Sequence, residues 1–455
     1  MPGGQNVAYR PDATYWGLQL QHMKPDLQQA LGADRVLVTG LVRHRFDGRD
    51  GRDGPYQRWK SVGNGIDTVP LNAAFCVTGI AVDCSTTNGC TMMAMVTPGT
   101  ASRQRRSGMV ETMRAQRFYA DSKEIAVEDV PIPELGQGEV LVKVAFCGIC
   151  HSDLSLINGT FPSQQAVVTQ GHEASGTIAK LGPGVIGWAE GDRVVVAAGR
   201  PCLECVNCRR GDLSNCLRIR LMAFAYDGAW AEYTVAQAFG LTRVPDNVTL
   251  EHAAILADAV STPYGAVVRT GKVGIGESVG VWGVGGVGTH VVQLARLVGA
   301  APIIAVDIKP AVLDRALAVG ADYAFDARDD ALHDKIAEAT EGRQLDVAFD
   351  AVGLKSTFEQ ALGSLTVGGR LVGIGMSADA PTIGPTAMFN LFKRQVLGHL
   401  GYQNADIGTL ANLVSRGRLD LSRSISEIVS LEDVAKGIEK LEKADGDPIR
   451  ILVQP

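Results

Sequence analysis

The sequence has no long hydrophobic run, and this absence disfavours a helical membrane protein. No segment reaches about 18 uncharged apolar residues, the length that a membrane-spanning helix needs. The nearest approach, AAFCVTGIAV at residues 73–82, stops at Asp83. The N-terminus also lacks the basic-then-apolar order of a signal peptide. We therefore expect no membrane association and a cytoplasmic location.

Positive charge is also in short supply. The 455 residues carry 43 Lys and Arg against 49 Asp and Glu, a formal net charge of −6. Nucleic-acid-binding proteins usually present a basic face, so this balance disfavours a nucleic-acid partner. The nine cysteines, in a reducing compartment, are better interpreted as free thiols or metal ligands than as disulfides. The length predicts more than one domain.

The chain changes character near residue 113. Residues 1–112 show no sustained hydrophobic periodicity and contain GRDGRDG at 48–54. We interpret them as a weakly ordered N-terminal extension, with a regulatory or partner-binding domain as the alternative. Met109 and Met113 are both candidates for the true translational start.

Strand and helix patterns become clear after Met113. EVLVKVAFCG at 139–148 alternates like a strand, and DRVVVAAG at 192–199 has the composition of a buried one. From about 266 to 398, apolar strands alternate with helical segments. That order predicts an α/β fold with a parallel sheet covered on both faces.

Four cysteines lie close together in the segment PCLECVNCRRGDLSNC. They form a C-x2-C-x2-C-x7-C array of Cys202, Cys205, Cys208 and Cys216. Such spacing can wrap four thiolates around one tetrahedral ion, and zinc suits this structural role. An iron–sulfur cluster is the alternative metal, while four free thiols would be an oxidation hazard. The neighbouring positive charges that could offset the thiolates are Arg209, Arg210, Arg218 and Arg220.

A second set of candidate ligands is spread along the chain. CGICHSDL at 147–154 is followed by GHEASG at 171–176. Cys150 can supply a thiolate and His172 an imidazole, whereas a catalytic zinc normally takes three protein ligands and keeps a fourth position open. Cys147 and Cys150 also form a C-x-x-C pair, but the fold context of a thioredoxin-like redox motif is absent.

A glycine-rich loop indicates a dinucleotide site. GVGGVG at 283–288 follows an apolar strand and opens a helix, whose N-terminus can bind a pyrophosphate. Gly283 permits the tight turn, Gly285 lets the backbone approach the phosphates, and Gly288 allows close packing of helix on strand. The loop is completed by Gly286 and Val287.

The strand APIIAVD, which follows the loop helix, ends in an acid. Asp307 stands where a carboxylate hydrogen-bonds the ribose 2′-hydroxyl and repels a 2′-phosphate, which predicts NAD rather than NADP. We expect Lys309 to lie along the adenosine ribose.

Taken together, these motifs resemble a zinc-containing alcohol dehydrogenase of the medium-chain dehydrogenase/reductase superfamily. The resemblance covers residues 113–455 and rests on GICHSDL, GHE, the four-cysteine segment, GAWAEY at 228–233, STPYGA at 261–266 and GVGGVG, in that order. It implies a mostly β, GroES-like catalytic domain over 113–259, with a structural zinc lobe at 202–216. A Rossmann-type doubly wound sheet that binds NAD would follow over 260–398, and residues 399–455 would return to the catalytic domain.

The resemblance also supplies a third zinc ligand. In the family Cys150 and His172 would bind the catalytic zinc, and the third ligand is usually a cysteine shortly before a Ser-Thr turn. Here that position holds Asp258. Zinc with two anionic ligands and a neutral histidine is net neutral, and oxygen is an accepted donor. The alternative for Asp258 is a helix cap before the Ser-Thr-Pro break at 261–263.

Other positions take roles from the same resemblance. Ser152 would accept the substrate proton, and Asp153 and Glu173 would be carboxylates that tune the metal site from behind its ligands. His151 would lie near the cofactor phosphates. The family's relay histidine falls at Ser155.

The cofactor and the substrate pocket involve further residues. Thr262, Val372 and Ile374 would lie near the nicotinamide and Arg450 near the pyrophosphate, although Val372 and Ile374 could equally be core residues. Ala198 stands where many members have an aromatic pocket wall, which suggests a roomier pocket.

We therefore expect an NAD-dependent zinc alcohol dehydrogenase that converts an alcohol to an aldehyde or ketone, with two zinc ions per chain. A homodimer or homotetramer is expected, because the pocket in this family draws partly on a neighbouring subunit. The alternatives are a polyol or amino-alcohol dehydrogenase of the same superfamily, a zinc-free reductase or binding protein, and a zinc-ribbon nucleic-acid-binding protein.

Overall fold

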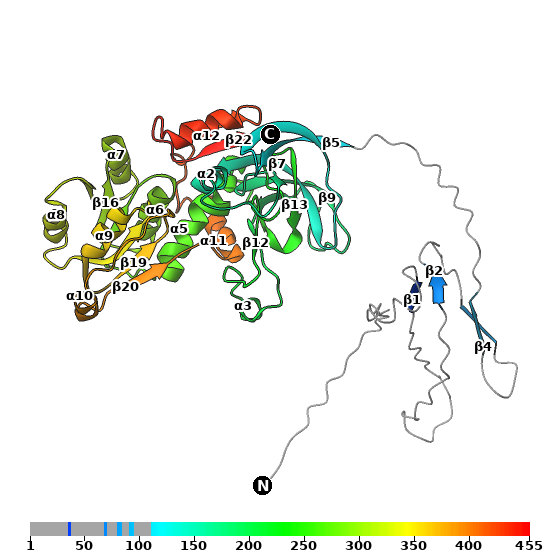
Figure 1. The fold of residues 1–455 in the computed structure, drawn as a ribbon, viewed down its shortest axis with the longest axis horizontal. Helices are drawn as coiled ribbons and strands as arrows, with labels where there is room; N and C mark the ends of the chain where they lie inside the picture. Colours follow the sequence, from blue (N-terminus) through cyan, green and yellow to red (C-terminus); the bar gives the residue numbers. More distant parts are fainter. Residues whose placement is uncertain (1–34, 38–67, 71–79, 84–90, 95–110) are drawn as a thin grey trace, which may run out of the picture. The chain divides into compact units, whose positions relative to one another are not determined.

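The computed structural model describes residues 35–37, 68–70, 80–83, 91–94 and 111–455 (Figure 1). Contacts divide the chain into two units, Met1–Gly108 and Met109–Pro455. In the first unit β1 (Arg35–Leu37) pairs with β2 (Thr68–Pro70), and β3 (Ile80–Asp83) pairs with β4 (Thr91–Ala94). The expectation of a weakly ordered extension falls mainly on residues outside those described.

The first half of the second unit is mostly β. Its strands are β5 (Thr112–Tyr119), β6 (Glu124–Pro131), β7 (Glu139–Ile149), β8 (Val167–Val168), β9 (Ala174–Leu181), β10 (Arg193–Val196), β13 (Tyr233–Gln237) and β14 (Leu241–Arg243). One sheet has the order β6-β5-β8. The other runs β14-β10-β9-β7-β22-β21, with β13 also paired to β7. β21 (Glu427–Ser430) and β22 (Ile451–Gln454) come from the end of the chain, which therefore returns to this half.

The second half contains one six-stranded sheet in which every neighbouring pair is parallel. The strands are β15 (Val279–Trp282), β16 (Ile303–Asp307), β17 (Tyr323–Asp326), β18 (Leu345–Asp350), β19 (Leu365–Gly373) and β20 (Gln395–Gly398). Their order is β17-β16-β15-β18-β19-β20, so the winding direction reverses between β15 and β18. The doubly wound sheet expected from the sequence is confirmed, and ligands of such sheets bind at this reversal.

Helices cover both faces of the parallel sheet (Figure 1). They are α6 (Gly286–Val298), α7 (Pro310–Ala318), α8 (Leu332–Ala339), α9 (Lys355–Gly363) and α10 (Thr386–Leu391). Val281 packs in one buried cluster with residues of α6 and α7, whereas the adjacent Trp282 packs in another with residues of α8 and α9. Successive strand residues point to opposite faces, so continuous apolar strands are buried on both sides.

One long helical stretch joins the two halves, and it corrects a prediction. α4 (Leu250–Ile255), a π-helical turn over Leu256–Val260, α5 (Ser261–Tyr264) and a second π turn over Gly265–Thr270 follow one another without a gap. The expected Ser-Thr-Pro break at 261–263 is therefore wrong. Pro263 is tolerated because the wider π turn before it already interrupts regular α-helical hydrogen bonding.

Smaller elements frame the rest. α2 (His151–Asn158) follows β7, and α3 (Val206–Arg209) lies in the four-cysteine lobe between β11 (Gly199–Arg200) and β12 (Arg220–Leu221). α11 (Asn404–Ser415) lies between α5 and this lobe, and α12 (Val434–Glu442) lies beside β22 (Figure 1). Within the part of the chain that the structure describes, no helix has the length and hydropathy of a bilayer span.

Candidate functional site

Four potential metal ligands converge where β7 meets α2. One ligand atom from each lies within 4.8 Å of the others in the group Cys150, His172, Glu173 and Asp258. The Cys150 Sγ lies 3.5 Å from the Asp258 Oδ2, and the same oxygen lies 3.6 Å from the His172 Nε2. We refer to Cys150, His172 and Asp258 as the mixed cluster.

Local backbone features place the first two members. Cys150 is the N-cap of α2, and its N–H donates to the Asp153 Oδ2 at 2.9 Å. Gly171, just before His172, has φ +88°, and a Cβ there would collide with the Trp230 ring. This glycine therefore lets the GHE segment pass close beneath the indole, which delivers His172 to the site.

The imidazole of His172 is oriented by groups on both sides. Its Nε2 faces the mixed cluster and lies 3.1 Å from the Ser152 Oγ, while its Nδ1 lies 3.4 Å from the Asp153 Oδ1. Burial alone would lower the pKa of His172, but Asp153, Asp258 and Cys150 outweigh it and raise this pKa well above its usual value. A carboxylate behind a histidine is the usual arrangement of a metal-binding imidazole.

Asp258 lies inside the helix, not at its end. The helix begins under the cap of Thr249, whose Oγ1 accepts the His252 N–H at 3.3 Å, so the helix-cap alternative for Asp258 is wrong. The Thr262 hydroxyl donates to the Asp258 Oδ1, which leaves the Oδ2 facing the cluster. Burial would raise the pKa of Asp258, but His172 and Thr262 hold it below its usual range. The wider π turn aims the carboxylate inward, as such turns often do at functional sites.

The donor set fits a zinc ion. A thiol, an imidazole nitrogen and a carboxylate oxygen are the three ligand types that zinc accepts, and they meet in a buried place where a cation would offset their negative charge. The His172 Nδ1 lies 3.4 Å from the Asp153 Oδ1 on the other side of the ring, which leaves the Nε2 free to face a cation.

A buried ion pair lies directly behind the cluster. The Arg450 Nε is 3.3 Å from the Glu173 Oε2, and the Arg450 Nη1 donates to the Ile149 carbonyl at 2.9 Å. Burial raises the pKa of Glu173 to about 8, against the lowering influence of Arg450. A Cβ at Gly286 would lie 3.5 Å from the Arg450 Nη2. Arg450 thus stands between the mixed cluster and the glycine-rich loop.

The loop itself has the geometry that its glycines suggest. Gly283 has φ +80°, and a Cβ on Gly288 would collide with the Gly283 carbonyl oxygen. A Cβ on Gly285 would meet no atom within 4 Å, so this position faces open space. The Asp307 Oδ2 accepts the Val284 N–H at 2.8 Å, which ties the end of β16 to the loop.

The other residues predicted near the cofactor occupy varied surroundings. The Lys309 ammonium pairs with Asp447. The Val372 side chain is fully buried in the core, so only its backbone could contact a nicotinamide, whereas Ile374 is 9% exposed. His151 is the exposed first residue of α2, and the Ser155 Oγ donates to its carbonyl at 3.1 Å.

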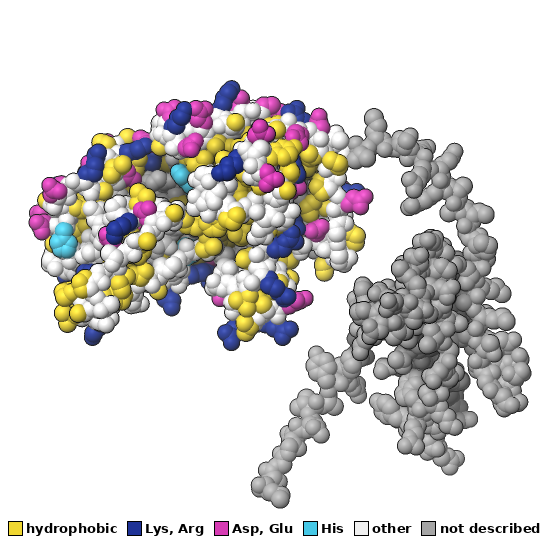
Figure 2. Space-filling view, in the orientation of Figure 1, with side chains coloured by type: hydrophobic (Ala, Val, Ile, Leu, Met, Phe, Trp, Pro, Cys, Tyr) yellow, Lys and Arg dark blue, Asp and Glu magenta, His cyan; other side chains and the backbone are white. Residues whose placement is uncertain are grey.

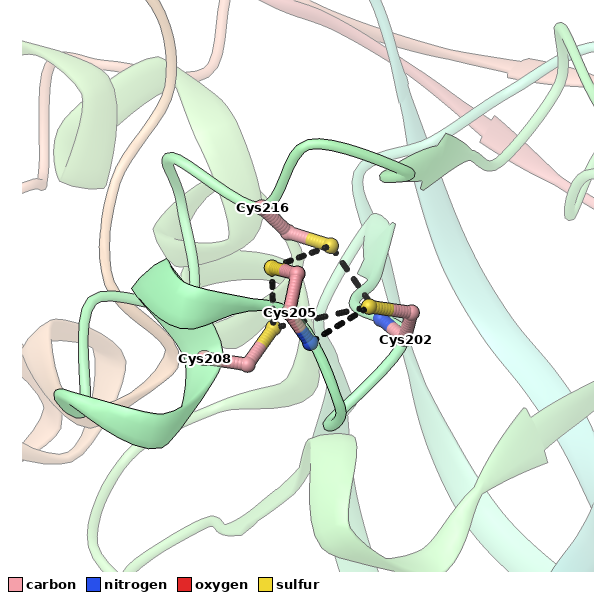
Figure 3. A group of neighbouring side chains, drawn as sticks. All are labelled: Cys202, Cys205, Cys208 and Cys216. Carbon is pink, nitrogen blue, oxygen red and sulfur yellow. Dashed lines mark hydrogen bonds between the residues drawn. The ribbon is translucent and has the colours of Figure 1, made fainter.

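The four cysteines of the lobe point toward one another (Figure 3). Their sulfur atoms lie 3.5 Å apart for Cys205 and Cys208, 3.9 Å for Cys205 and Cys216, and 4.0 Å for Cys202 and Cys208. The backbone N–H groups of Glu204 and Cys205 are the main cause that lowers the pKa of Cys202 to about 6. Four sulfurs at this spacing, with a favoured thiolate among them, fit one tetrahedral cation.

Two of the four arginines predicted to offset the lobe's charge differ in their contacts. The Arg218 Nη2 lies 3.5 Å from the Cys202 Sγ and also pairs with Glu204 at 2.8 Å. Arg220 instead donates to the Ala225 carbonyl at 3.0 Å and lies over the Tyr226 ring. Arg218 is therefore the arginine placed to stabilise a thiolate.

Comparisons with known proteins point in one direction. Residues 136–246 match the family described as "Alcohol dehydrogenase GroES-like domain", and residues 286–416 match "Zinc-binding dehydrogenase". The NAD-dependent alcohol dehydrogenase of Sulfurisphaera tokodaii is 30% identical over 75% of this chain and 100% of its own. D-xylulose reductase A of Aspergillus niger is 33% identical over 71% and 92%.

A solved structure adds the fold. A Sinorhizobium meliloti protein described as a zinc-binding dehydrogenase, and solved bound to NADP, is 28% identical. It covers 76% of this chain and 100% of its own, with a TM-score of 0.71.

Sequence reasoning missed three aromatic residues at this site. The Phe224 ring lies 6.0 Å from the His172 ring, centroid to centroid. The Tyr402 hydroxyl accepts the Ala198 N–H at 3.0 Å, and the Tyr226 hydroxyl donates to the Ala198 carbonyl at 2.9 Å. The room expected beside Ala198 is thus approached by two tyrosines, and no motif spacing could have linked positions 198 and 402.

Proposed function

Since this chain belongs to the zinc-containing alcohol dehydrogenases of the medium-chain dehydrogenase/reductase superfamily, we propose that it oxidises an alcohol to an aldehyde or ketone, reversibly, with NAD as hydride acceptor. The main support is that Cys150, His172 and Asp258 converge at one place. The Ser152 Oγ lies 3.1 Å from the His172 imidazole. Three ligands of this kind leave one position for a substrate oxygen.

Two zinc ions per chain are part of the proposal. The mixed cluster would hold one, with Glu173 directly behind it, and the four lobe cysteines would hold the other. When bound at the mixed cluster, zinc supplies Lewis-acid chemistry that lowers the pKa of an alcohol. The lobe offers four sulfur ligands and no further position, so its role is structural.

The side chains around the cluster would divide the work of proton transfer and orientation. The half-buried Ser152 hydroxyl would accept the alcohol proton and pass it outward. Asp153 would hold His172 through its Nδ1, and Thr262 would hold Asp258 through the Oδ1. These contacts would keep both ligands in one rotamer before substrate arrives.

The cofactor side is supported by the glycine-rich loop and Asp307. The loop and the N-terminus of α6 would bind the pyrophosphate, with Arg450 nearby, and the substrate hydride would move to the nicotinamide. Asp307, at the end of β16, would favour NAD by accepting from the ribose 2′-hydroxyl. Because a relative was solved bound to NADP, the ratio of rates with NAD⁺ and NADP⁺ tests the role of Asp307 directly.

A polyol is the second candidate substrate class. It is favoured by the similarity to D-xylulose reductase A and to sorbitol dehydrogenase of Bacillus subtilis, which is 29% identical over 76% of this chain. The proposed chemistry is the same for a simple alcohol and a polyol, because only the groups around the reacting carbon differ.

We also propose a cytoplasmic homo-oligomer. Both cysteine-containing sites need reduced thiols, which a cytoplasm provides. β20 lies at the edge of the parallel sheet, and exposed apolar side chains gather on it and beside it at Val396, Leu391 and Leu400. An exposed apolar strand edge is a surface that a second copy can cover.

Steady-state kinetics of the zinc-loaded chain test the function. Rates would be measured with NAD⁺ and NADP⁺ against primary, secondary, aromatic and polyhydroxy alcohols, alongside zinc content per chain. NAD⁺-dependent oxidation with two zinc ions would support the proposal. An active chain without zinc, or a zinc-loaded chain that oxidises no alcohol in the panel, would contradict it.

A further inference from the structure

Tyr402 and its neighbour Gln403 occupy the connection between β20 and α11. The Tyr402 hydroxyl reaches Ala198, just before the four-cysteine lobe. Its ring packs, partly buried, against the core cluster that contains the helix of Asp258. Burial raises the pKa of Tyr402, whereas the hydrogen bond from the Ala198 N–H lowers it. The Tyr402 side chain therefore lies between Ala198 and the buried cluster that includes Ala257 and Ala259, the residues on either side of Asp258.

The Gln403 side chain points to the lobe and makes four hydrogen bonds there. Its Oε1 accepts the N–H groups of Leu213 at 3.1 Å and Ser214 at 3.3 Å. Its Nε2 donates to the Asp212 Oδ1 and the Ser214 Oγ, each at 2.7 Å. These three lobe residues lie between the third and fourth cysteines of the array. The loop that a lobe metal would close is thus clamped to Gln403.

A second set of polar contacts holds the connection between β20 and α11. The Gln403 N–H donates to the Asp406 Oδ2 at 3.0 Å, and Asp406 pairs with Arg269 on the long helix that also carries Asp258. Figure 1 shows α11 between α5 and the lobe. Figure 2 shows that the lobe projects from the body with basic side chains around its tip, which are arginines because the segment has no lysine. Within the part of the chain that the structure describes, Gln403 connects the lobe to the start of α11.

We propose that Gln403 is a positioning residue through which the four-cysteine lobe holds Tyr402 as one wall of the alcohol site, so that Tyr402 determines specificity. The two residues share one peptide bond, and a shift of the amide on the lobe therefore moves the phenol beside Ala198. This assignment rests on the proposed alcohol dehydrogenase function. It gives the lobe a part in substrate choice as well as in stability.

Two substitutions test the assignment in the zinc-loaded chain. Tyr402→Ala should raise kcat/KM for a bulky alcohol such as benzyl alcohol relative to ethanol by about tenfold or more, the usual scale of a changed pocket wall. Gln403→Ala should shift the same ratio in the same direction by a smaller factor, through KM for the alcohol, with KM for NAD⁺ and zinc content unchanged. Tyr402→Phe keeps the ring and should shift the ratio least.

Asn207→Ala is the matched control. The Asn207 Nδ2 donates to the Asn215 carbonyl at 2.6 Å, so this side chain also braces the lobe, and that bond involves neither Gln403 nor Tyr402. Asn207→Ala should leave the benzyl alcohol to ethanol ratio unchanged. The positioning role of Gln403 is refuted if Asn207→Ala and Gln403→Ala shift the ratio equally, or if Gln403→Ala does not shift it. If Tyr402→Ala keeps the wild-type ratio, Tyr402 does not form a wall of the alcohol site.

Fluorine NMR separates this inference from the function it rests on. With 3-fluorotyrosine at position 402, the resonance should move in Gln403→Ala and stay in place in Asn207→Ala, whether or not any alcohol is oxidised. If wild-type and Gln403→Ala chains give identical fluorine spectra, Gln403 does not position Tyr402, even in an active enzyme. A shifted resonance in a chain that oxidises no alcohol would support the positioning role of Gln403 and reject the proposed function.

Discussion

The two cysteine-containing sites are built in opposite ways. The lobe draws its four sulfurs from one loop, Cys202 to Cys216, held by nearby backbone N–H groups. The mixed cluster draws Cys150, His172 and Asp258 from three separate segments, and the first and last of them are 108 positions apart in the sequence. Asp153 supports both Cys150 and His172, and Thr262 supports Asp258. A local site can form wherever its loop forms, whereas a dispersed site exists only once the whole half-molecule has folded.

The largest effect should follow from breaking the local site. Cys208→Ser removes one of four sulfur ligands, and the lobe metal should be lost with several kcal/mol of unfolding free energy, because structural zinc contributes directly to folding. Thermal unfolding and zinc analysis would measure it. Cys147→Ser, at a buried cysteine outside both sites, is the control and should keep both metals. If Cys208→Ser and Cys147→Ser lose equal amounts of zinc and unfolding free energy, the lobe cysteines have no special structural role.

Removing the proton acceptor should affect rate and leave metal binding intact. Ser152→Ala should lower kcat by about 10²- to 10⁴-fold, the usual contribution of a positioned acid–base group, with two zinc ions retained. The pH–rate profile and zinc content give the readout, and Ser155→Ala should change the rate far less. A Ser152→Ala enzyme with the wild-type rate would take the hydroxyl out of the reaction.

Cofactor choice should change by a smaller factor. Asp307→Ser would remove the proposed carboxylate bond to the ribose and the proposed repulsion of a 2′-phosphate. The ratio of kcat/KM for NAD⁺ over NADP⁺ should therefore fall by about 10- to 100-fold, the worth of one charged hydrogen bond. Zinc content of both sites should stay the same. A wild type that already uses NADP⁺ equally well would contradict the assignment.

The smallest effect should come from removing residues 1–108. Every residue of both sites lies after Met109, and a chain starting there keeps the Glu111 carbonyl that accepts the Ile132 N–H at 2.9 Å. Activity and Tm should match those of the full chain. A start at Met113 removes that pair and the first residue of β5, so it should lower Tm slightly. An inactive but folded Met109 chain would show that the extension takes part in function.

The sequence predicted most where chemistry is local. The cysteine spacing, the glycine-rich loop and the apolar strands each carry their meaning within one short segment, and the structure brings each of them together. The ligand role of Asp258 is predicted only from the order of the motifs, because the residues next to it in the sequence do not indicate a metal site.

The remaining features depend on contacts between distant positions. The pairing of Lys309 with Asp447 and the contact of Tyr402 with Ala198 each join segments that no pattern relates. Packing of the folded chain decides such contacts, so a single sequence does not display them.

Zinc content of Asp258→Asn decides whether Asp258 is a ligand of the mixed cluster. Asparagine keeps the size of the side chain but removes the charge, so the mixed cluster should lose its metal while the lobe keeps its own. We expect one zinc per chain with little activity in Asp258→Asn, and two zinc ions with partial activity in Asp258→Cys. Two zinc ions and full turnover in Asp258→Asn would show that Asp258 is not a ligand.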